Sequence, residues 1–352
     1  MIRRGDKFIL FLKENENSAK IFVVLFIITF LFCFFNSFFG IFEKNVCGDG
    51  TPYKECSKNQ PYYCSKGMLV QNASFCGCPE NSTKKENVCE YFYQTSPKFV
   101  MLYYVLDGNY KKINFSVYEG MVDYLKKNPQ HSFYFNGENY SLENFKLRVI
   151  NEPEQKKLLI PLVIEIQNIA KSKEEQARIA ISLVQNIPYE EQNDSMRQME
   201  IYFSSLKYPY DVLYQQEGLC GSKSDLLAFL LKEIGYDLVI FHYFQENHEA
   251  VGIKCPKRYS LNNTGYCFVE TTLPAIISYS QGEYFGEGAL DSNPKIVKIS
   301  EGISLDGSME EYRDARTFYR IYNSSKAYKK INLMEYFKMS QLTEKYGLVL
   351  NI

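Results

Sequence analysis

The chain has 352 residues, and its 40 lysines and arginines almost balance its 41 aspartates and glutamates. This balance argues against a nucleic-acid partner, which would need a basic surface. Hydrophobic residues make up 45% of the chain, which is enough for one main domain with a buried core and a smaller second part.

An apolar segment near the N-terminus predicts a membrane span. Residues 21–42 carry no charge, and about 20 apolar residues in a helix cross a lipid bilayer. A cleaved signal peptide is the alternative, but its apolar region is usually about 7–15 residues long and ends in small residues. Here the run is longer and contains the bulky Phe38 and Phe39 near its end. We therefore expect an uncleaved anchor at 20–42.

The basic residues before this anchor predict its orientation. A flank rich in Lys and Arg tends to stay in the cytoplasm, so residues 1–19 should form a cytoplasmic tail and the rest should be extracytoplasmic. Seven Asn-x-Ser/Thr sequons follow the anchor, as in an exported glycoprotein, although an Asn- and Ser-rich chain also contains some by chance. They begin at Asn72, Asn81, Asn114, Asn139, Asn193, Asn262 and Asn323.

Residues 43–92 predict a small disulfide-rich module. This segment has too little apolar content to bury a core, so it needs covalent cross-links. Zinc is the alternative, but the segment has no His and no Cys-x-x-Cys. We expect three disulfides and no metal, with 15 possible pairings among which the sequence does not choose. The six cysteines are Cys47, Cys56, Cys64, Cys76, Cys78 and Cys89.

An α/β segment at 93–154 comes next. It predicts two strands joined by a turn at Asp107-Gly108-Asn109, and then a helix ended by Pro129. A larger domain at 155–280 follows. A helix that starts near Pro153 leads into it, and apolar spacing predicts a second helix that Pro188 stops.

The centre of the larger domain is predicted to be a buried helix followed by three strands. The helix runs from about Gly221 to Ile234, with Gly235 in the left-handed position after its end. The strands are "DLVIFHYF", "HEAVGIK" and "YCFVETT". Cys255 and Cys267 flank a turn-rich stretch, which predicts a hairpin closed by a disulfide. The extension at 281–352 adds a strand, "KIVKI", and two helices.

Cys220 is the cysteine that this scheme leaves over outside the membrane span, where Cys33 would lie. An odd thiol in an exported protein suggests reactivity, with an inert buried thiol as the alternative. The position of Cys220 at the start of a helix favours its thiolate, because the helix N-terminus carries partial positive charge.

A nucleophilic cysteine needs a base and a group that orients the base. If Cys255 and Cys267 face each other across the hairpin, Gly252 faces Glu270, and His248 projects from the same face as Glu270. On that register His248 and Glu270 lie about four residues apart along the strand, and a shift or bulge would bring them closer.

Each of these side chains also has an ordinary interpretation. His248 could be a surface histidine at a strand start, and Glu270 a solvated strand residue. Among the other histidines, His242 fits the interior of a sheet and His131 a polar loop. The order of cysteine, histidine and acid is therefore the signal, more than any one residue.

The stretch "GLCGSKSDLLAFLLKEIGY", followed by "NHEAVGI" and "FVETT", resembles the transglutaminase-like superfamily. The upstream "QARIAISLVQNIPY" and Tyr208-Pro209 also match, so the resemblance covers about 155–275. It implies an α+β, papain-like core with Cys220 as nucleophile, His248 as base and Glu270 as the third member. The module at 43–92 is similar to segments beside the membrane anchor of archaeal surface proteins of this kind.

The chain departs from the family pattern at three positions. Ser222 and Glu270 stand where many members have Asp, and Glu249 stands where many have Ala. These departures leave the three candidate residues in place but weaken any transfer of substrate.

The implied chemistry is acyl transfer on amide bonds of a protein or peptide, as in a cross-linking enzyme, a peptidase or an amidase. The Cys220 N–H would be one oxyanion donor, and Gln215 or Gln216 could be the second. The alternative is an inactive cell-surface binding or structural module of the same fold. We expect no cofactor, since there is no Gly-rich phosphate loop, and no Cys-x-x-Cys points to a thiol oxidoreductase.

Overall fold

The computed structural model describes residues 25–27, 29, 45–128, 141–190, 207–278, 283–284, 288–328 and 331–349. Residues 46–352 form one compact unit, to which the following description applies. The predicted tail at 1–19 and most of the predicted anchor at 20–42 lie outside the described residues, while 25–27 and 29 are helical. Within the described ranges, no helix is both long and apolar enough to span a bilayer.

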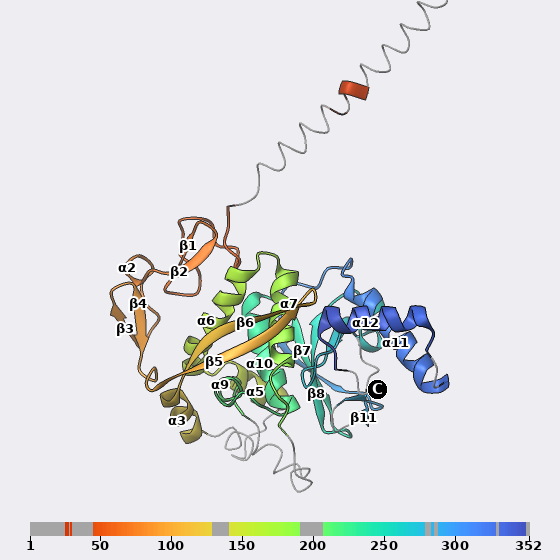
Figure 1. Cartoon of the computed structure of the whole chain (residues 1–352). Coiled ribbons are helices and arrows are strands. Elements are labelled where there is room, and N and C mark those ends of the chain that lie inside the picture. Colours follow the sequence, from red (N-terminus) through yellow and green to blue (C-terminus); the bar gives the residue numbers. More distant parts are fainter. Residues whose placement is uncertain are drawn as a thin grey trace, which may run out of the picture. The chain divides into compact units, whose positions relative to one another are not determined.

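The fold is α+β with antiparallel sheets and disulfides, as expected (Figure 1). Its largest sheet has four antiparallel strands in the order β12-β7-β8-β9. These are β12 (Lys295–Ser300), β7 (Leu238–Tyr243), β8 (His248–Lys254) and β9 (Tyr266–Val269). The predicted strand "KIVKI" is thus an edge strand of this sheet, and the C-terminal extension completes it.

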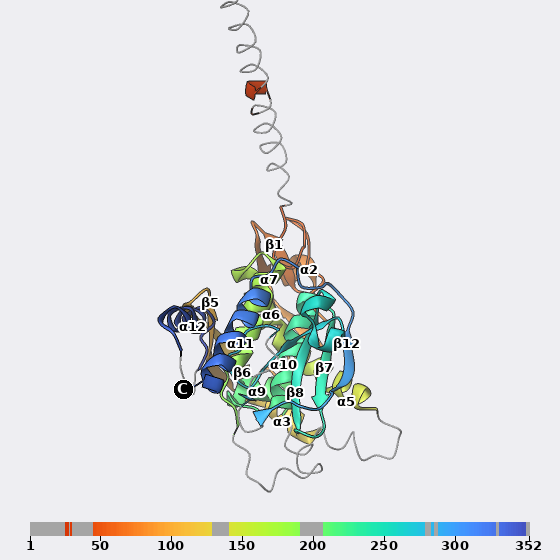
Figure 2. The same ribbon diagram turned by 90° about the vertical axis from the view of Figure 1, so that its right-hand side faces the viewer.

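Helix α10 (Cys220–Ile234) lies against this sheet and is buried at every residue except Lys232 (Figures 1 and 2). Its apolar residues surround the helix, which explains why it occupies the centre of the core. Gly235 ends it with φ 115°, in the left-handed region predicted for it. Four helices contact α10, namely α5 (Leu142–Ile150), α6 (Pro153–Ile169), α7 (Lys173–Gln185) and α9 (Pro209–Gln215).

A long hairpin covers α7. It consists of β5 (Pro97–Leu106) and β6 (Asn109–Tyr118), joined at the predicted Asp107-Gly108 turn and followed by α3 (Glu119–Lys127). Side chains alternate along β5, with Val100, Leu102 and Tyr104 buried. This period of two gives β5 one buried face.

The three disulfides predicted for the cysteine-rich segment, called the disulfide module below, are present. Its elements are β1 (Tyr62–Ser65), β2 (Met68–Gln71), α2 (Ala73–Cys76), β3 (Ser82–Lys85) and β4 (Val88–Tyr91). The pairing that the sequence left open is Cys47–Cys64, Cys56–Cys76 and Cys78–Cys89. The module consists of small two-stranded sheets, so these three bonds supply the cross-links that its small core cannot.

The predicted Cys255–Cys267 disulfide is present, but the strand register expected from it was wrong. Gly252 pairs with Phe268, and Ile253 pairs with Cys267. The two cysteines therefore bridge positions that are two residues apart in register, with a Cα–Cα distance of 5.7 Å. Such a distance suits a disulfide between diagonal neighbours as well as one between facing residues.

The remaining elements complete the chain. The turn-rich stretch between β8 and β9 forms the 3-10 helices η2 (Lys257–Tyr259) and η3 (Leu261–Asn263). A short pair, β10 (Glu283–Tyr284) and β11 (Gly288–Ala289), precedes β12. The two helices predicted for the extension are α11 (Glu311–Tyr328) and α12 (Leu333–Tyr346).

Candidate active site

Cys220 is the first residue of α10 and is fully buried. Every other cysteine in the described part of the chain is in a disulfide, and Cys33 lies outside that part. Leu219 occupies the N-cap position and offers no side-chain acceptor to the helix N–H groups. The thiol therefore lies at a helix terminus whose partial positive charge no capping side chain neutralises.

The turn between β7 and β8 brings His248 to this helix terminus. Tyr243 pairs with His248 across a turn whose last residue, Asn247, has φ 51°. The Cys220 Sγ lies 3.8 Å from the Asn247 carbonyl oxygen, directly before His248. The left-handed conformation suits asparagine, and it places the histidine at the first position of β8.

His248 and Glu270 project from one face, as the sequence predicted, and their side chains also meet. The His248 Nε2 lies 2.9 Å from the Glu270 Oε2, and both side chains are buried. The observed register accounts for this distance, because it shortens the offset between them from four residues to two. Glu270 follows the last residue of β9, rather than lying within that strand.

Backbone groups hold Glu270 in place. Its Oε1 accepts hydrogen bonds from the N–H groups of Thr271 and Thr272 at 2.9 and 2.8 Å, and from the Thr272 hydroxyl at 2.7 Å. The Gln185 amide donates to the Glu270 carbonyl oxygen at 2.9 Å. One carboxylate oxygen is thus fixed by three donors while the other remains for His248, which fixes the orientation of the imidazole.

The site favours an imidazolium. Burial alone would lower the pKa of His248, but the charge of Glu270 and hydrogen bonds with Cys220 and Glu270 raise it well above its usual value. Burial likewise tends to raise the pKa of Glu270, yet His248 and the Thr272 donors lower it. Glu270 binds Nε2, and a hydrogen bond with Cys220 is a second contribution to the raised pKa of His248. Cys220, His248 and Glu270 thus lie together at the start of α10.

Lys223 is a second charged group at the site. It lies one turn after Cys220 on α10, is fully buried, and donates to the carbonyl oxygens of Ile187 and Thr272 at 2.5 and 3.1 Å. Burial lowers its pKa to about 7, while Glu270 and Cys220 act in the opposite direction. Lys223 thereby links α10 to the segment that follows Glu270.

A buried ion cluster lies behind the site. Lys146 of α5 contacts Asp225 of α10 at 3.1 Å and Glu249 of β8 at 2.5 Å, and Glu249 contacts the His242 Nδ1 at 2.7 Å. All four side chains are buried. Burial raises the pKa of Asp225 to about 7, whereas Lys146 and His242 overcome burial and lower that of Glu249 to about 2. Glu249 therefore carries the charge that neutralises Lys146.

The two glutamines considered as oxyanion donors differ in position. Gln216 donates its amide to the Met101 carbonyl oxygen at 2.9 Å, so this amide is engaged with β5. Gln215 is exposed, whereas Cys220 is not. Within the described residues, neither glutamine contacts Cys220. Of the two oxyanion donors expected from the sequence, the Cys220 N–H therefore remains.

Sequence reasoning missed Lys146, Gln185, Lys223 and Asp225. For Lys223 and Asp225 a signal existed, since both are charged residues inside a helix whose surface is otherwise mostly apolar. Such residues are buried only when they are paired or hydrogen-bonded. Lys146 has no comparable signal near it, because its partners Asp225 and Glu249 lie far along the chain.

The fold and site together define an α+β protein with disulfides and a buried Cys–His–Glu arrangement at the start of its central helix. No protein-family model matches the chain, and no curated protein matches it.

Proposed function

We propose that the chain is a membrane-anchored, extracytoplasmic thiol acyl-transfer enzyme with a transglutaminase-like, papain-like core. Cys220, His248 and Glu270 would act on amide bonds of a protein or peptide. The observation that carries the proposal is the hydrogen bond between His248 and a Glu270 held by backbone N–H groups, next to the helix-terminal Cys220. The four disulfides support an oxidising compartment.

In the first half-reaction the Cys220 thiolate attacks the amide carbonyl carbon. A bond forms from Sγ to this carbon, the carbonyl electron pair moves to oxygen, and the Cys220 N–H stabilises the oxyanion. The C–N bond then breaks, and the His248 Nδ1 gives its proton to the departing amine. Glu270 remains ionised and holds the ring, so that the same nitrogen faces each successive intermediate.

In the second half-reaction neutral His248 takes a proton from the acceptor. Water as acceptor gives a carboxylic acid, and a lysine amine as acceptor gives a new amide. Either one attacks the thioester carbon, and the thiolate leaves. Both outcomes use the same three residues, so the acceptor that reaches Cys220 decides between hydrolysis and cross-linking.

One observation favours a second candidate function, an inactive surface-binding or structural module with the same fold. Cys220 and His248 are both fully buried, and a substrate must reach the sulfur for any acyl transfer. A structural thiol would have the same burial. The two candidates differ in whether Cys220 can form a thioester in the folded protein.

Trapping an acyl-enzyme distinguishes them. The full chain is incubated with a small activated amide, and the mass of intact protein is followed over time. Acyl transfer predicts one added acyl group, mapped to Cys220, that is absent in Cys220→Ala and strongly slowed in His248→Ala. The absence of an adduct on wild-type protein that remains folded would support the inactive module.

A further inference from the structure

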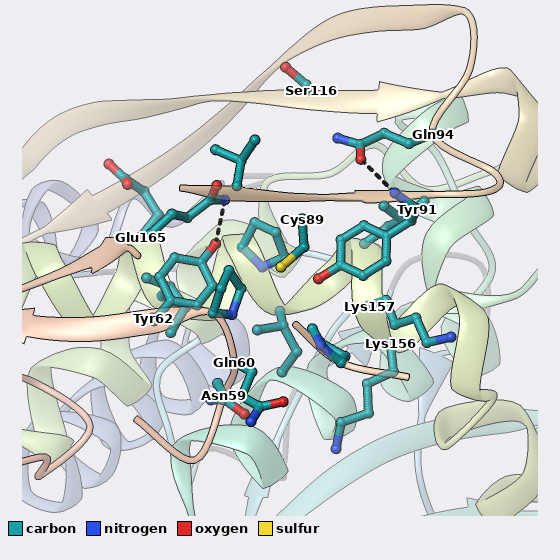
Figure 3. A pocket seen from close by; sticks show the side chains of 18 of the residues that line it. Asn59, Gln60, Tyr62, Cys89, Tyr91, Gln94, Ser116, Lys156, Lys157 and Glu165 are labelled. Carbon is teal, nitrogen blue, oxygen red and sulfur yellow. Dashed lines mark hydrogen bonds between the residues drawn. The ribbon is translucent and has the colours of Figure 1, made fainter. Parts of the chain in front are cut away.

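A groove of about 1290 Å³ lies between the disulfide module and the rest of the unit (Figure 3). Strands β1, β2 and β4 supply residues on one side, and β6 and α6 supply residues on the other. None of Cys220, His248 or Glu270 lines it. The groove is therefore a feature separate from the candidate active site, and the proposed function does not use it.

The chemistry of the lining suits a neutral ligand rich in hydroxyl groups. Seven asparagines or glutamines and three tyrosines line the groove. Its three lysines are nearly balanced by two glutamates, and Lys156 and Lys157 are paired with Glu233 and Glu154 at 2.7 Å each. Amide side chains both donate and accept hydrogen bonds, and tyrosines add an apolar ring face beside a hydroxyl. Sugars present matching groups.

Tyr91 is one of the three tyrosines that line the groove. Figure 3 shows its hydroxyl pointing into the groove. Burial, with a smaller contribution from Tyr62, raises the pKa of Tyr91 to about 12, so this hydroxyl stays neutral. A neutral phenol can stack on a sugar ring and also hydrogen-bond to it.

Asn114 places a glycan acceptor on the wall of this groove. It begins the sequon Asn114-Phe115-Ser116 on β6, and its side chain is exposed. Both Asn114 and Ser116 line the groove. Among the other sequons in the described ranges, Asn72 caps α2 and Asn262 contacts Asn293, while Asn81 and Asn323 are exposed away from the groove.

We propose that Asn114 is an N-glycosylation site and that the first sugars of its glycan occupy the groove between the disulfide module and α6. The Asn114 Nδ2 forms a bond to the anomeric carbon of a lipid-linked sugar donor and loses a proton. The bond from that carbon to phosphate breaks, and the lipid phosphate leaves. This inference rests on the extracytoplasmic location proposed above, but it does not depend on acyl transfer by Cys220.

The modification is tested on the full chain purified from its native cells. Trypsin cleavage after Lys112 and Lys126 releases residues 113–126, which contain one sequon. We expect this peptide to carry a sugar mass that Asn114→Gln abolishes and Ser116→Thr retains, since threonine also completes the sequon. Asn323→Gln is the control and should leave the peptide modified. If Asn114 is unmodified in wild-type protein that is exported, the glycosylation proposal fails, but the proposed function is unaffected.

The position of the glycan is tested by radical footprinting of Tyr91 in the same proteins. A glycan in the groove shields the ring, so labelling of Tyr91 should increase in Asn114→Gln and stay unchanged in Asn323→Gln. Equal thermal unfolding of the variants shows that they are folded. Equal labelling of Tyr91 in wild type and Asn114→Gln would overturn the placement in the groove. If the chain is not exported, both the glycosylation proposal and the proposed extracytoplasmic location fail.

Discussion

His248 and Glu249 are consecutive residues of β8, yet each belongs to a different set of charged groups on opposite faces of the strand. His248 contacts Glu270, whereas Glu249 contacts Lys146 and His242. Because side chains alternate along a strand, a single peptide unit links the candidate catalytic pair to the buried ion cluster. The cluster therefore anchors the backbone that positions His248, without contacting the thiol itself.

Replacing His248 by Ala should slow alkylation of Cys220 far more at about pH 6 than at about pH 9. The raised pKa of His248 keeps an imidazolium beside the sulfur in the acidic measurement, and this cation favours the thiolate. At about pH 9 a cysteine is largely ionised without such help. The rate is measured by mass spectrometry with a small haloacetamide, because Cys220 is buried.

The unfolded chain provides the control, since the His248 substitution should have no effect there. If wild type and His248→Ala react at the same rate at about pH 6, the catalytic interpretation fails. Resistance of both proteins at both pH values until they unfold would identify a structural thiol.

Replacing Glu270 by Gln should lower the pKa of His248. The carboxylate charge is the main factor that raises this pKa against burial, and glutamine removes it while preserving the shape. The imidazolium should then lose its proton at a lower pH than in wild type. NMR titration can follow this directly, because the chain has only three histidines.

Glu246→Gln is a matched control in the turn before β8. Glu246 accepts hydrogen bonds from Asp291 and Ser292 and makes none to His248. Its replacement should leave the His248 titration unchanged. A His248 titration that is identical in wild type and Glu270→Gln would mean that the pair is not an ionic one.

Lys146→Met and Glu249→Gln should each destabilise the protein by about 3–5 kcal/mol, the range for leaving a buried charge without its partner. The double variant should cost less than the sum of the two, because neither charge then remains. Urea unfolding measures the three free energies. The exposed Lys85–Glu90 pair is the control, and there we expect effects below about 1 kcal/mol. Additive losses at Lys146 and Glu249 would contradict a coupled cluster.

Lys223→Met should remove a rise in stability with pH. Burial lowers the pKa of Lys223 to about 7, compared with about 10.4 for an exposed lysine. Between these values the unfolded chain binds more protons than the folded one, so the free energy of unfolding increases with pH in that window. The variant lacks this increase, and its stability relative to wild type should be higher at pH 7 than at pH 10.

Denaturant unfolding at several pH values measures this difference. Lys111→Met is the control, because Lys111 is exposed on β6. Its stability relative to wild type should not change with pH. A flat difference for Lys223→Met would show that Lys223 binds its proton equally well in both states.

Protease added to intact cells should digest the chain beyond the predicted anchor at 20–42. This prediction is based on the uncharged run at 21–42 and on the disulfides that follow it. Thiol titration of unfolded, unreduced protein should find only Cys33 and Cys220. Complete protection from protease would contradict the proposed topology, and additional thiols would contradict the disulfide assignment.

Local patterns in the sequence were sufficient to predict α10, the β5–β6 hairpin and the three strands after α10. Apolar period, turn residues such as Asp107-Gly108 and the terminal Gly235 act within a few residues, so each can be read without knowing the fold. The same holds for the surplus of Cys220, which follows from counting cysteines.

Long-range features could not be predicted in the same way. Lys146 and Glu249 are 103 residues apart, and nothing near Lys146 in the sequence indicates a buried partner. The hairpin register failed for a related reason. The Cys255–Cys267 bond constrains a distance, and two registers satisfy that distance, so packing between strands decides between them.

Lys146 also limits how far the protein can be truncated from its N-terminus. A fragment that starts at residue 155, the boundary predicted for the larger domain, would bury Asp225 and Glu249 without the cation they share. It would also lack β5, which covers α7. Such a fragment should aggregate on expression, whereas one that starts at Val46 retains the whole compact unit. The smallest fragment that we expect to fold by itself is thus far larger than the candidate active site.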